Sequence, residues 1–342
     1  MNVVRYCLCF FILATHTFKL SGISMPRMES CIATAVGCFF TLSGFLMFPP
    51  FQKRPTLRHY IRKRALRILP PYIFIVLLCA LLLSFTSTLP AREYFTDSGF
   101  WKYLAANLSF LNFLHPDLPG VFVGDMFVTN AVNGSLWTMK GEWICYLSEP
   151  FVFMLIKRAS GKGGAILGGV TAALILIRLL LLCMSEASGS EFYDIIARQF
   201  GVVLIYFYIG ALLNYYYPLL MRYKWWILAF DLIVIALGDY IPNYHVALQP
   251  IATGSLVILV SMVGKWGTRL SRHDNVSYDI YLFHFPIIQL CVLYGLPQKM
   301  PHIALLLIVA AATVILALIS WNLVGKRFNA ITSRHKKEKE AS

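Results

Sequence analysis

Residues 3–18 read VVRYCLCFFILATHTF, an apolar segment with a cation near its start and an imidazole inside it. An ionisable side chain within a membrane span is unfavourable, so each one marks a candidate functional site. A helix rises about 1.5 Å per residue, which places His16 roughly 16 Å from Arg5 along the axis. In a hydrocarbon core about 30 Å thick, that depth is close to the middle of the membrane. The segment therefore predicts a membrane span with a functional residue inside it.

The composition of the whole chain is that of a membrane protein. Of its 342 residues, 58% are hydrophobic and 13% are charged, whereas soluble domains carry about 25% charged residues. The apolar runs are continuous, which excludes the alternating pattern of a transmembrane β-barrel. The net charge of +14 fits basic cytoplasmic loops that face anionic lipid, so we expect membrane lipid, and no nucleic acid, as a partner.

Apolar runs of about 17–25 residues are long enough to span a membrane. The sequence predicts an all-α, polytopic transmembrane helix bundle of about ten spans, at 4–20, 31–48, 68–88, 142–157, 164–184, 199–217, 225–241, 247–264, 277–295 and 302–324. Lys and Arg are about three times as frequent in one set of loops as in the other. Because cytoplasmic loops carry the excess of cations, both termini are predicted to be cytoplasmic.

Two segments fall outside the predicted spans. The connection 89–141 is the longest, and loops of this length are usually functional or disordered. Its aromatic residues predict a partly ordered extracytoplasmic cap, with the amphipathic stretch 100–114 at the membrane interface. The basic residues at 329–342 predict a disordered cytoplasmic tail, which leaves 1–328 as a single transmembrane domain.

His16 is the first candidate for chemistry. Imidazole titrates near neutral pH, so a histidine at this depth could remove the proton of an acceptor hydroxyl. The alternative is a histidine that packs between helices, with Thr15 and Thr17 as its hydrogen-bonding neighbours. His284, in YDIYLFHFP, is a second intramembrane histidine that competes for the role of base, and Pro286 is expected to loosen the helix beside it.

Three arginines are candidates for binding an anion. Arg64 and Arg67 are three residues apart, so a helix would place both on one face. Two guanidinium groups on one face can hold a diphosphate in a bidentate manner. Arg5 lies at the cytoplasmic end of its span and could hold a further phosphate. The alternative for all three is anchoring to lipid headgroups.

Glu142 and Trp137 stand together before the fourth predicted span. A carboxylate at this position could orient an imidazolium or a sugar hydroxyl, or simply face the interface. The Trp137 indole could stack on a sugar ring or belong to the aromatic belt of the membrane. Glycine-rich phosphate loops, paired metal-ligand spacings and serine nucleophile elbows are absent from the sequence, so we expect no metal and no permanently bound cofactor.

Five short motifs resemble, in the same order, those of the membrane-bound acyltransferase-3 family, whose members O-acylate cell-surface carbohydrates in bacteria. The motifs are Arg5-x10-His16, GCFFTLSGFL at 37–46, RKRALRILPPY at 62–72, NGSLWTMKGEWICYL at 133–147 and SYDIYLFHFP at 277–286. One departure is WNLVGKRF at the last span, where the family usually has a Glu near Gly325 and a Pro near Arg327.

The resemblance implies a multi-pass O-acyltransferase of the bacterial plasma (inner) membrane. It implies cytoplasmic acyl-CoA, in the first place acetyl-CoA, as the donor substrate and a polysaccharide or lipid-linked oligosaccharide hydroxyl as the acceptor. Two alternatives are the same enzyme with a succinyl donor, and a non-enzymatic lipid-linked saccharide transporter or scaffold.

The resemblance also assigns roles to the candidate residues. His16 and Glu142 would be catalytic, and Trp137 and His284 would contact the substrate. The phosphates of the donor would be held by Arg5, Arg64 and Arg67.

Overall fold

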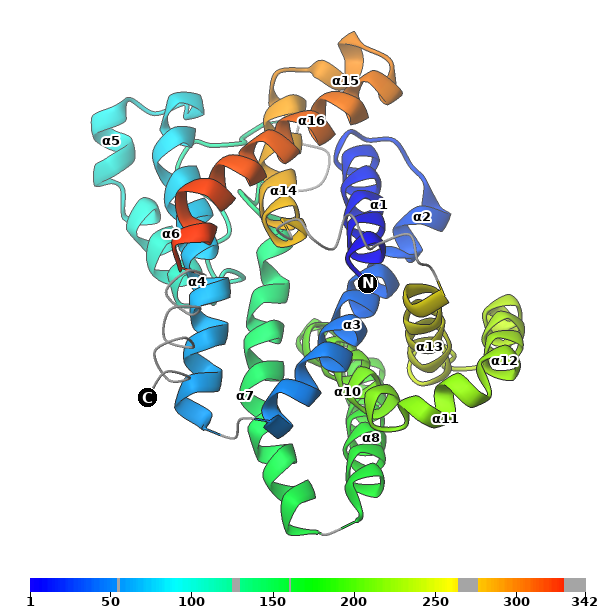
Figure 1. Ribbon diagram of the computed structural model, residues 1–342. Helices are drawn as coiled ribbons and strands as arrows, with labels where there is room; N and C mark the ends of the chain where they lie inside the picture. The colour runs from blue at the N-terminus through cyan, green and yellow to red at the C-terminus, as the bar shows by residue number, and fades with distance from the viewer. Residues whose placement is uncertain (54–55, 125–129, 160, 264–275, 329–342) are drawn as a thin grey trace. The chain divides into compact units, whose positions relative to one another are not determined.

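The computed structural model describes residues 1–53, 56–124, 130–159, 161–263 and 276–328 (Figure 1). Every regular element within these ranges is helical, as the continuous apolar runs predict. The predicted tail at 329–342 lies outside the described residues.

Six helices in the described part of the chain are long and apolar enough to cross a membrane. They comprise α1 (Asn2–Leu20), α2 with α3 (Pro26–Ser30, Ile32–Lys53), α4 with η1 (Leu57–Leu82, Leu83–Thr86), α8 (Gly163–Ser188), α9 to α10 (Glu191–Ile196, Ala197–Gly201, Val202–Tyr215) and α16 with η7 (His302–Ser320, Trp321–Gly325). Two shorter apolar helices are α13 (Leu248–Val263) and α14 (Ser277–Leu293). The chain is thus an all-α protein with several helices suited to a membrane.

Four predicted spans do not meet these criteria, and two of them, 247–264 and 277–295, are the shorter apolar helices α13 and α14. The run 142–157 lies within α7 (Trp137–Arg158), which also carries several charged side chains. The run 225–241 forms α12 (Lys224–Ala236) and a separate 3-10 turn, η4 (Gly238–Tyr240). The 13 residues of α12 rise only about 20 Å, less than the hydrocarbon core of about 30 Å. The count of ten spans therefore stays a prediction, as do the positions of the termini.

The chain forms two compact units. Unit 1 comprises Met1–Leu8, Ser30–Tyr60 and Gly141–His273, and unit 2 comprises Cys9–Glu29, Ile61–Lys140 and Asp274–Ser342. Short helices complete the chain, namely α5 (Ala91–Thr96), α6 (Ser98–Leu108), η2 (Gly134–Leu136), α11 (Tyr217–Arg222) and α15 (Leu296–Lys299).

In unit 1, α3 packs against α10 through glycines. A Cβ atom at Gly44 would lie 1.9 Å from the carbonyl oxygen of Phe207, and one at Gly210 would lie 2.1 Å from that of Thr41. Glycines permit such backbone contact between membrane helices. The motif at 37–46 is therefore a packing motif in this chain.

Two charged side chains of unit 1, for which the sequence suggests no role, each have a hydrogen-bonding partner. The Ser255 hydroxyl lies 2.8 Å from each carboxylate oxygen of Asp231, which joins α13 to α12. The Arg178 guanidinium donates to the carbonyl of His245 at 2.9 Å. Buried charges need such partners, so both side chains have a structural explanation.

In unit 2, the predicted cap at 89–141 is ordered by aromatic side chains. The Tyr94 hydroxyl donates to the carbonyl of Ala80 at 2.8 Å, and the Tyr72 hydroxyl donates to that of Asn107 at 2.6 Å. These bonds attach α5 and α6 to α4. Part of this segment is thus helical, whereas its role as a cap and the side of the membrane on which it lies stay predictions.

Candidate functional site

The site in unit 2 is organised around a proline in α14. Pro286 has no N–H, so it cannot donate to the carbonyl of Leu282 four residues earlier. The Asn133 side-chain amide donates to this carbonyl instead, at 2.8 Å. The Ser135 hydroxyl donates to Oδ1 of Asn133 at 2.6 Å, which fixes the orientation of the amide. The motif that begins at Asn133 is thus bound to α14 where the proline interrupts its hydrogen bonding.

Two further contacts hold the same segment on α14. The Gln289 side chain donates to the carbonyl of Ala131 at 3.0 Å. A Cβ atom at Gly134 would lie 2.7 Å from the ring of Phe285, so this position has room only for glycine unless the ring moves. The segment therefore fixes the place of Phe285, which lies next to His284.

The two intramembrane histidines contact each other. Nδ1 of His16 lies 2.8 Å from Nε2 of His284, although the two residues are 268 positions apart in the sequence. Their ring planes differ by 3°, and their centres are 5.1 Å apart. The Phe285 and His16 rings make an edge-to-face contact, with their centres 5.8 Å apart and their planes at 77°. The two histidines are predicted to compete for the role of base, whereas in the structure they lie within hydrogen-bonding distance of each other.

The neighbours of His16 do not supply its hydrogen bonds. The hydroxyls of Thr15 and Thr17 donate to the carbonyls of Phe11 and Leu13, in each case at 2.8 Å and four residues back in α1. This is the usual way for threonine to bond within a helix. The predicted packing network through Thr15 and Thr17 is therefore wrong.

His284 has a second partner in its own helix. Nδ1 of His284 lies 2.7 Å from the carbonyl oxygen of Tyr281, and the side chain is 1% exposed. His16 is only partly buried. Of the two histidines, His16 thus has the larger exposed fraction.

The arginines of α4 share one helix but differ in exposure. Arg64 is buried, with 5% of its surface exposed, whereas Arg67 is exposed. The Tyr278 hydroxyl donates to the carbonyl of Ile68 at 3.2 Å, which fastens the start of α14 to α4. Both residues lie in α4, and their predicted place on one anion-binding face stays a prediction.

A buried carboxylate lies beside this cationic segment. Asp279 accepts a hydrogen bond from the Ser320 hydroxyl at 2.7 Å and is 2% exposed. The first turn of α14 thus carries a buried carboxylate, and His284 follows five residues later in the same helix. In Figure 1, α16 crosses α14, and this contact brings Ser320 to Asp279.

The remaining candidates are placed as follows. Trp137 begins α7 in unit 2 and is partly buried. Glu142 follows in the same helix but belongs to unit 1, where it accepts a hydrogen bond from Tyr146 at 2.6 Å. Arg5 belongs to unit 1 and is buried, with 8% exposed. Their predicted roles stay predictions.

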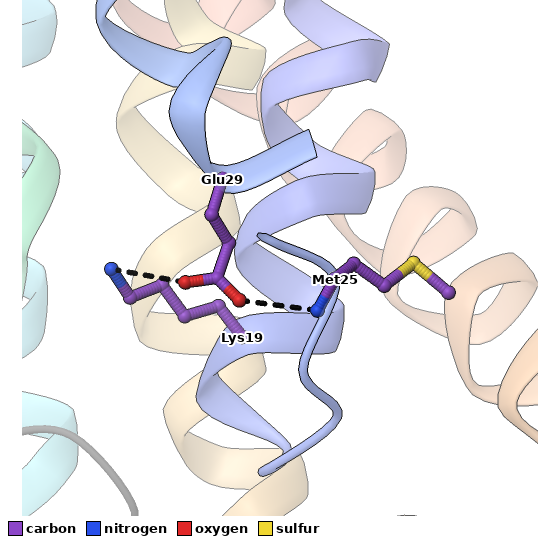
Figure 2. Close-up of polar contacts among 3 residues, drawn as sticks. All are labelled: Lys19, Met25 and Glu29. Carbon is purple, nitrogen blue, oxygen red and sulfur yellow. Dashed lines mark hydrogen bonds and ion pairs between the residues drawn. The ribbon is translucent and has the colours of Figure 1, made fainter. Parts of the chain in front are cut away.

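The end of α1 is tied to the next helix just after His16. Figure 2 shows Glu29 between Lys19 and the backbone N–H of Met25. The ammonium of Lys19 lies 3.6 Å from the carboxylate, and the N–H of Met25 donates to it at 3.2 Å. Lys19 is in the last turn of α1, where a cation also stabilises the helix dipole.

Several of these residues are not singled out by sequence analysis. Asn133, Ser135 and Asp279 stand inside quoted motifs without a role, and Ser320 stands outside any motif. The spacing between Leu282 and Pro286 is a usable signal, because it leaves one carbonyl in need of a donor. Within the described ranges, the structure has no group of three or more His, Cys, Asp or Glu side chains placed to hold a metal ion.

The chain is thus a helical protein with several helices suited to a membrane, a contacting pair of imidazoles and a basic helix segment. The model of the acyltransferase-3 family, an acyltransferase domain, matches residues 1–322, and the chain belongs to this family. The resemblance found in the five motifs is confirmed. The chain is an acyltransferase, which sets aside the transporter or scaffold alternative.

Two relatives extend the comparison. An O-acetyl transferase of Shigella phage Sf6 is 23% identical over 339 residues, which cover 96% of this chain and 95% of the relative. Nodulation protein 10 of Rhizobium leguminosarum bv. viciae is 25% identical over 312 residues, which cover 85% and 81% of the two chains. No solved structure is significantly similar to the chain.

Proposed function

We propose that this enzyme transfers an acetyl group from cytoplasmic acetyl-CoA to a hydroxyl of a cell-surface or lipid-linked polysaccharide. The observation that carries the proposal is the contact of 2.8 Å between His16 and His284. A hydrogen-bonded imidazole within apolar helices is a base that is oriented by its neighbour and sheltered from water. The phage relative is an O-acetyl transferase, which supports acetyl as the group transferred.

In the proposed reaction, His16 takes the proton of the acceptor hydroxyl as its oxygen attacks the thioester carbonyl. The new C–O bond forms and the C–S bond breaks, so the acetyl group passes to the acceptor and CoA leaves as the thiolate. The proton then moves from His16 to the thiolate, which regenerates the base. A base in this position typically contributes a factor of about 10²–10⁴ to the rate.

The donor would be held by the arginines. Arg64 and Arg67 on α4 bind the diphosphate, and Arg5 binds a further phosphate. The roughly 16 Å of helix between Arg5 and His16 is a length that an extended pantetheine arm can bridge. The acceptor would lie beside Trp137, with its hydroxyl oriented by Glu142.

This assignment requires a definite topology. Residues 1–328 form one transmembrane domain of about ten spans in the bacterial plasma membrane, with both termini in the cytoplasm and the 89–141 cap outside. The acetyl group therefore crosses the membrane inside the protein, because acetyl-CoA is made in the cytoplasm and the acceptor is reached from outside.

The test of the function uses a bacterial host that lacks the gene and is complemented in turn with wild type, His16→Ala and Thr15→Val. Mass spectrometry of the surface glycans is expected to show an acetyl substituent with wild type and Thr15→Val, and none with His16→Ala. Thr15 is a matched control, because its hydroxyl bonds only to its own helix in the contacts described. A succinyl substituent would correct the donor, and full acylation with His16→Ala would overturn the assignment of the base.

The topology has its own test. Ser98 and Thr56 are both exposed, so a cysteine at either position is accessible to a thiol reagent. In a background without native thiols and with activity retained, Ser98→Cys is expected to react with an impermeant maleimide in intact spheroplasts. Thr56→Cys is expected to react only after permeabilisation. The reverse pattern would place Arg64 and Arg67 on the wrong side for a cytoplasmic donor.

A further inference from the structure

The two imidazoles form a directed hydrogen-bond chain that can be followed from its fixed end. The carbonyl oxygen of Tyr281 can only accept a hydrogen bond. It lies 2.7 Å from Nδ1 of His284, so this nitrogen carries the proton. The backbone carbonyl of Tyr281 thus fixes the position of one hydrogen atom, the one on Nδ1 of His284.

The charge of His284 decides the next link. Its side chain is 1% exposed, with Phe285 and Tyr281 among its ring neighbours. A buried, unpaired cation is strongly unfavourable, so the imidazole is neutral and has a single N–H. Since Nδ1 holds that proton, Nε2 of His284 has a lone pair and accepts.

The third link follows from the contact between the histidines. Nε2 of His284 accepts, so Nδ1 of His16, 2.8 Å away, is the donor. The nearly parallel rings, with their nitrogen edges closest and their centres 5.1 Å apart, have the geometry of an in-plane N–H···N bond. A face-to-face stack would instead bring the ring faces into contact.

We infer that His284 is a positioning residue that holds His16 as the Nδ1–H tautomer, so that Nε2 of His16 is the nitrogen that removes the acceptor proton. The inference rests on the proposed function in one respect, namely that His16 is the base. It adds which nitrogen acts, and it assigns to His284 the part that a carboxylate plays beside a catalytic histidine in hydrolases.

The experiment compares His284→Phe, His284→Gln and Gln289→Leu in purified protein in lipid nanodiscs. Phenylalanine keeps a planar ring without a hydrogen bond, whereas the glutamine amide oxygen can accept from His16. Gln289→Leu is the matched control, because it removes a buried hydrogen bond of the same helix at the Ala131 carbonyl. Steady-state kinetics with acetyl-CoA and ¹⁵N NMR of labelled histidine are measured on each protein.

For His284→Phe, we expect kcat to fall by about 10²-fold or more, with the KM for acetyl-CoA within about twofold of wild type. His284→Gln should recover at least a tenth of the wild-type kcat. Gln289→Leu is expected to lose thermal stability and to keep kcat within about threefold. In wild type, the His16 signals, assigned by their loss in His16→Ala, should be those of a protonated Nδ1 and an unprotonated Nε2.

The outcomes separate this inference from the proposed function. If His16→Ala is inactive while His284→Phe retains the wild-type kcat, the inference fails and the function stands. A protonated Nε2 on His16 in the resting wild-type enzyme would also overturn it. If His16→Ala is itself active, the proposed base fails first. If the His284→Phe protein does not fold, the kinetics of His284→Gln and the NMR spectrum of the wild-type protein take its place. Either measurement alone tests the role of His284.

Discussion

The α3–α10 contact of unit 1 and the α1–α14 contact of unit 2 solve opposite problems. In the first, glycines bring backbone against backbone, so that a single added carbon at Gly44 would lie 1.9 Å from a carbonyl oxygen. In the second, two polar rings meet at 2.8 Å, and hydrogen bonds fix their orientation. Both contacts come from short motifs of the same family. The first motif thus provides close backbone packing, whereas the second provides a hydrogen bond between two side chains.

If this distinction is right, the largest loss of stability should come from the glycine contact. Gly44→Ala forces α3 and α10 apart and is expected to destabilise the protein by about 3 kcal/mol, at the upper end for overpacked cores. Gly168→Ala on α8 is the matched control, because a Cβ atom there meets nothing within 4 Å. Thermal unfolding in one detergent measures both. Equal melting temperatures for the two variants would remove the contrast.

The next effect is expected within unit 2, at the arginines. Arg64 is buried, so Arg64→Lys keeps the charge but loses the bidentate geometry, and the KM for acetyl-CoA should rise about tenfold. Arg67→Lys, at an exposed position, should raise it less. Calorimetric titration with CoA checks the binding directly. Unchanged affinity in both variants would favour lipid anchoring as the role of the pair.

A smaller effect, on kcat, is expected from a change in the packing around Phe285. The added methyl group of Gly134→Ala would lie 2.7 Å from the Phe285 ring, which packs with its edge against His16. The ring can rotate away, so we expect kcat to fall about threefold while the KM for acetyl-CoA is unchanged, a small loss of transition-state stabilisation alone. Initial rates at saturating donor measure this. A loss of folded protein with normal specific activity would instead place Gly134 with the packing glycines.

The smallest effect is expected at the surface contact of Figure 2. The side chains of Lys19 and Glu29 are 42% and 26% exposed, and ion pairs of this kind contribute about 0–1 kcal/mol. Glu29→Gln should therefore shift the unfolding free energy by less than about 0.5 kcal/mol, with kcat unaffected. Chemical denaturation followed by tryptophan fluorescence gives the comparison. A larger change would show that the end of α1 controls the position of His16.

Sequence reasoning finds the helices and the family because apolar runs and short motifs are local properties of the chain. It also finds both histidines, since any ionisable group in a span is conspicuous. The pairing of His16 with His284 is not predictable in this way, because it depends on two helices that are far apart in the chain. The different exposure of Arg64 and Arg67 is likewise set by neighbouring helices and not by their spacing.

Two departures show where local patterns are insufficient. Thr15 and Thr17 look like partners of His16 in the sequence, but the nearest acceptors for their hydroxyls are backbone carbonyls of α1. The run 225–241 is predominantly apolar, yet its helix ends at Ala236, and a glycine begins the next turn. The number of residues in an apolar run therefore overestimates the length of its helix when a turn interrupts the run.

The hydrogen-bond chain through His284 ends on the carbonyl of Tyr281, a neutral group. A carbonyl can orient an imidazole, but it does not offset a positive charge as the carboxylate of a hydrolase triad does. In the proposed reaction, protonated His16 is therefore high in free energy in its apolar surroundings. An acceptor that gives up its proton commits the enzyme in this scheme to pass that proton on to the departing thiolate. The proposed mechanism thus ties acceptor activation to donor cleavage in each turnover, because the hydrogen-bond chain ends on a backbone acceptor that carries no charge.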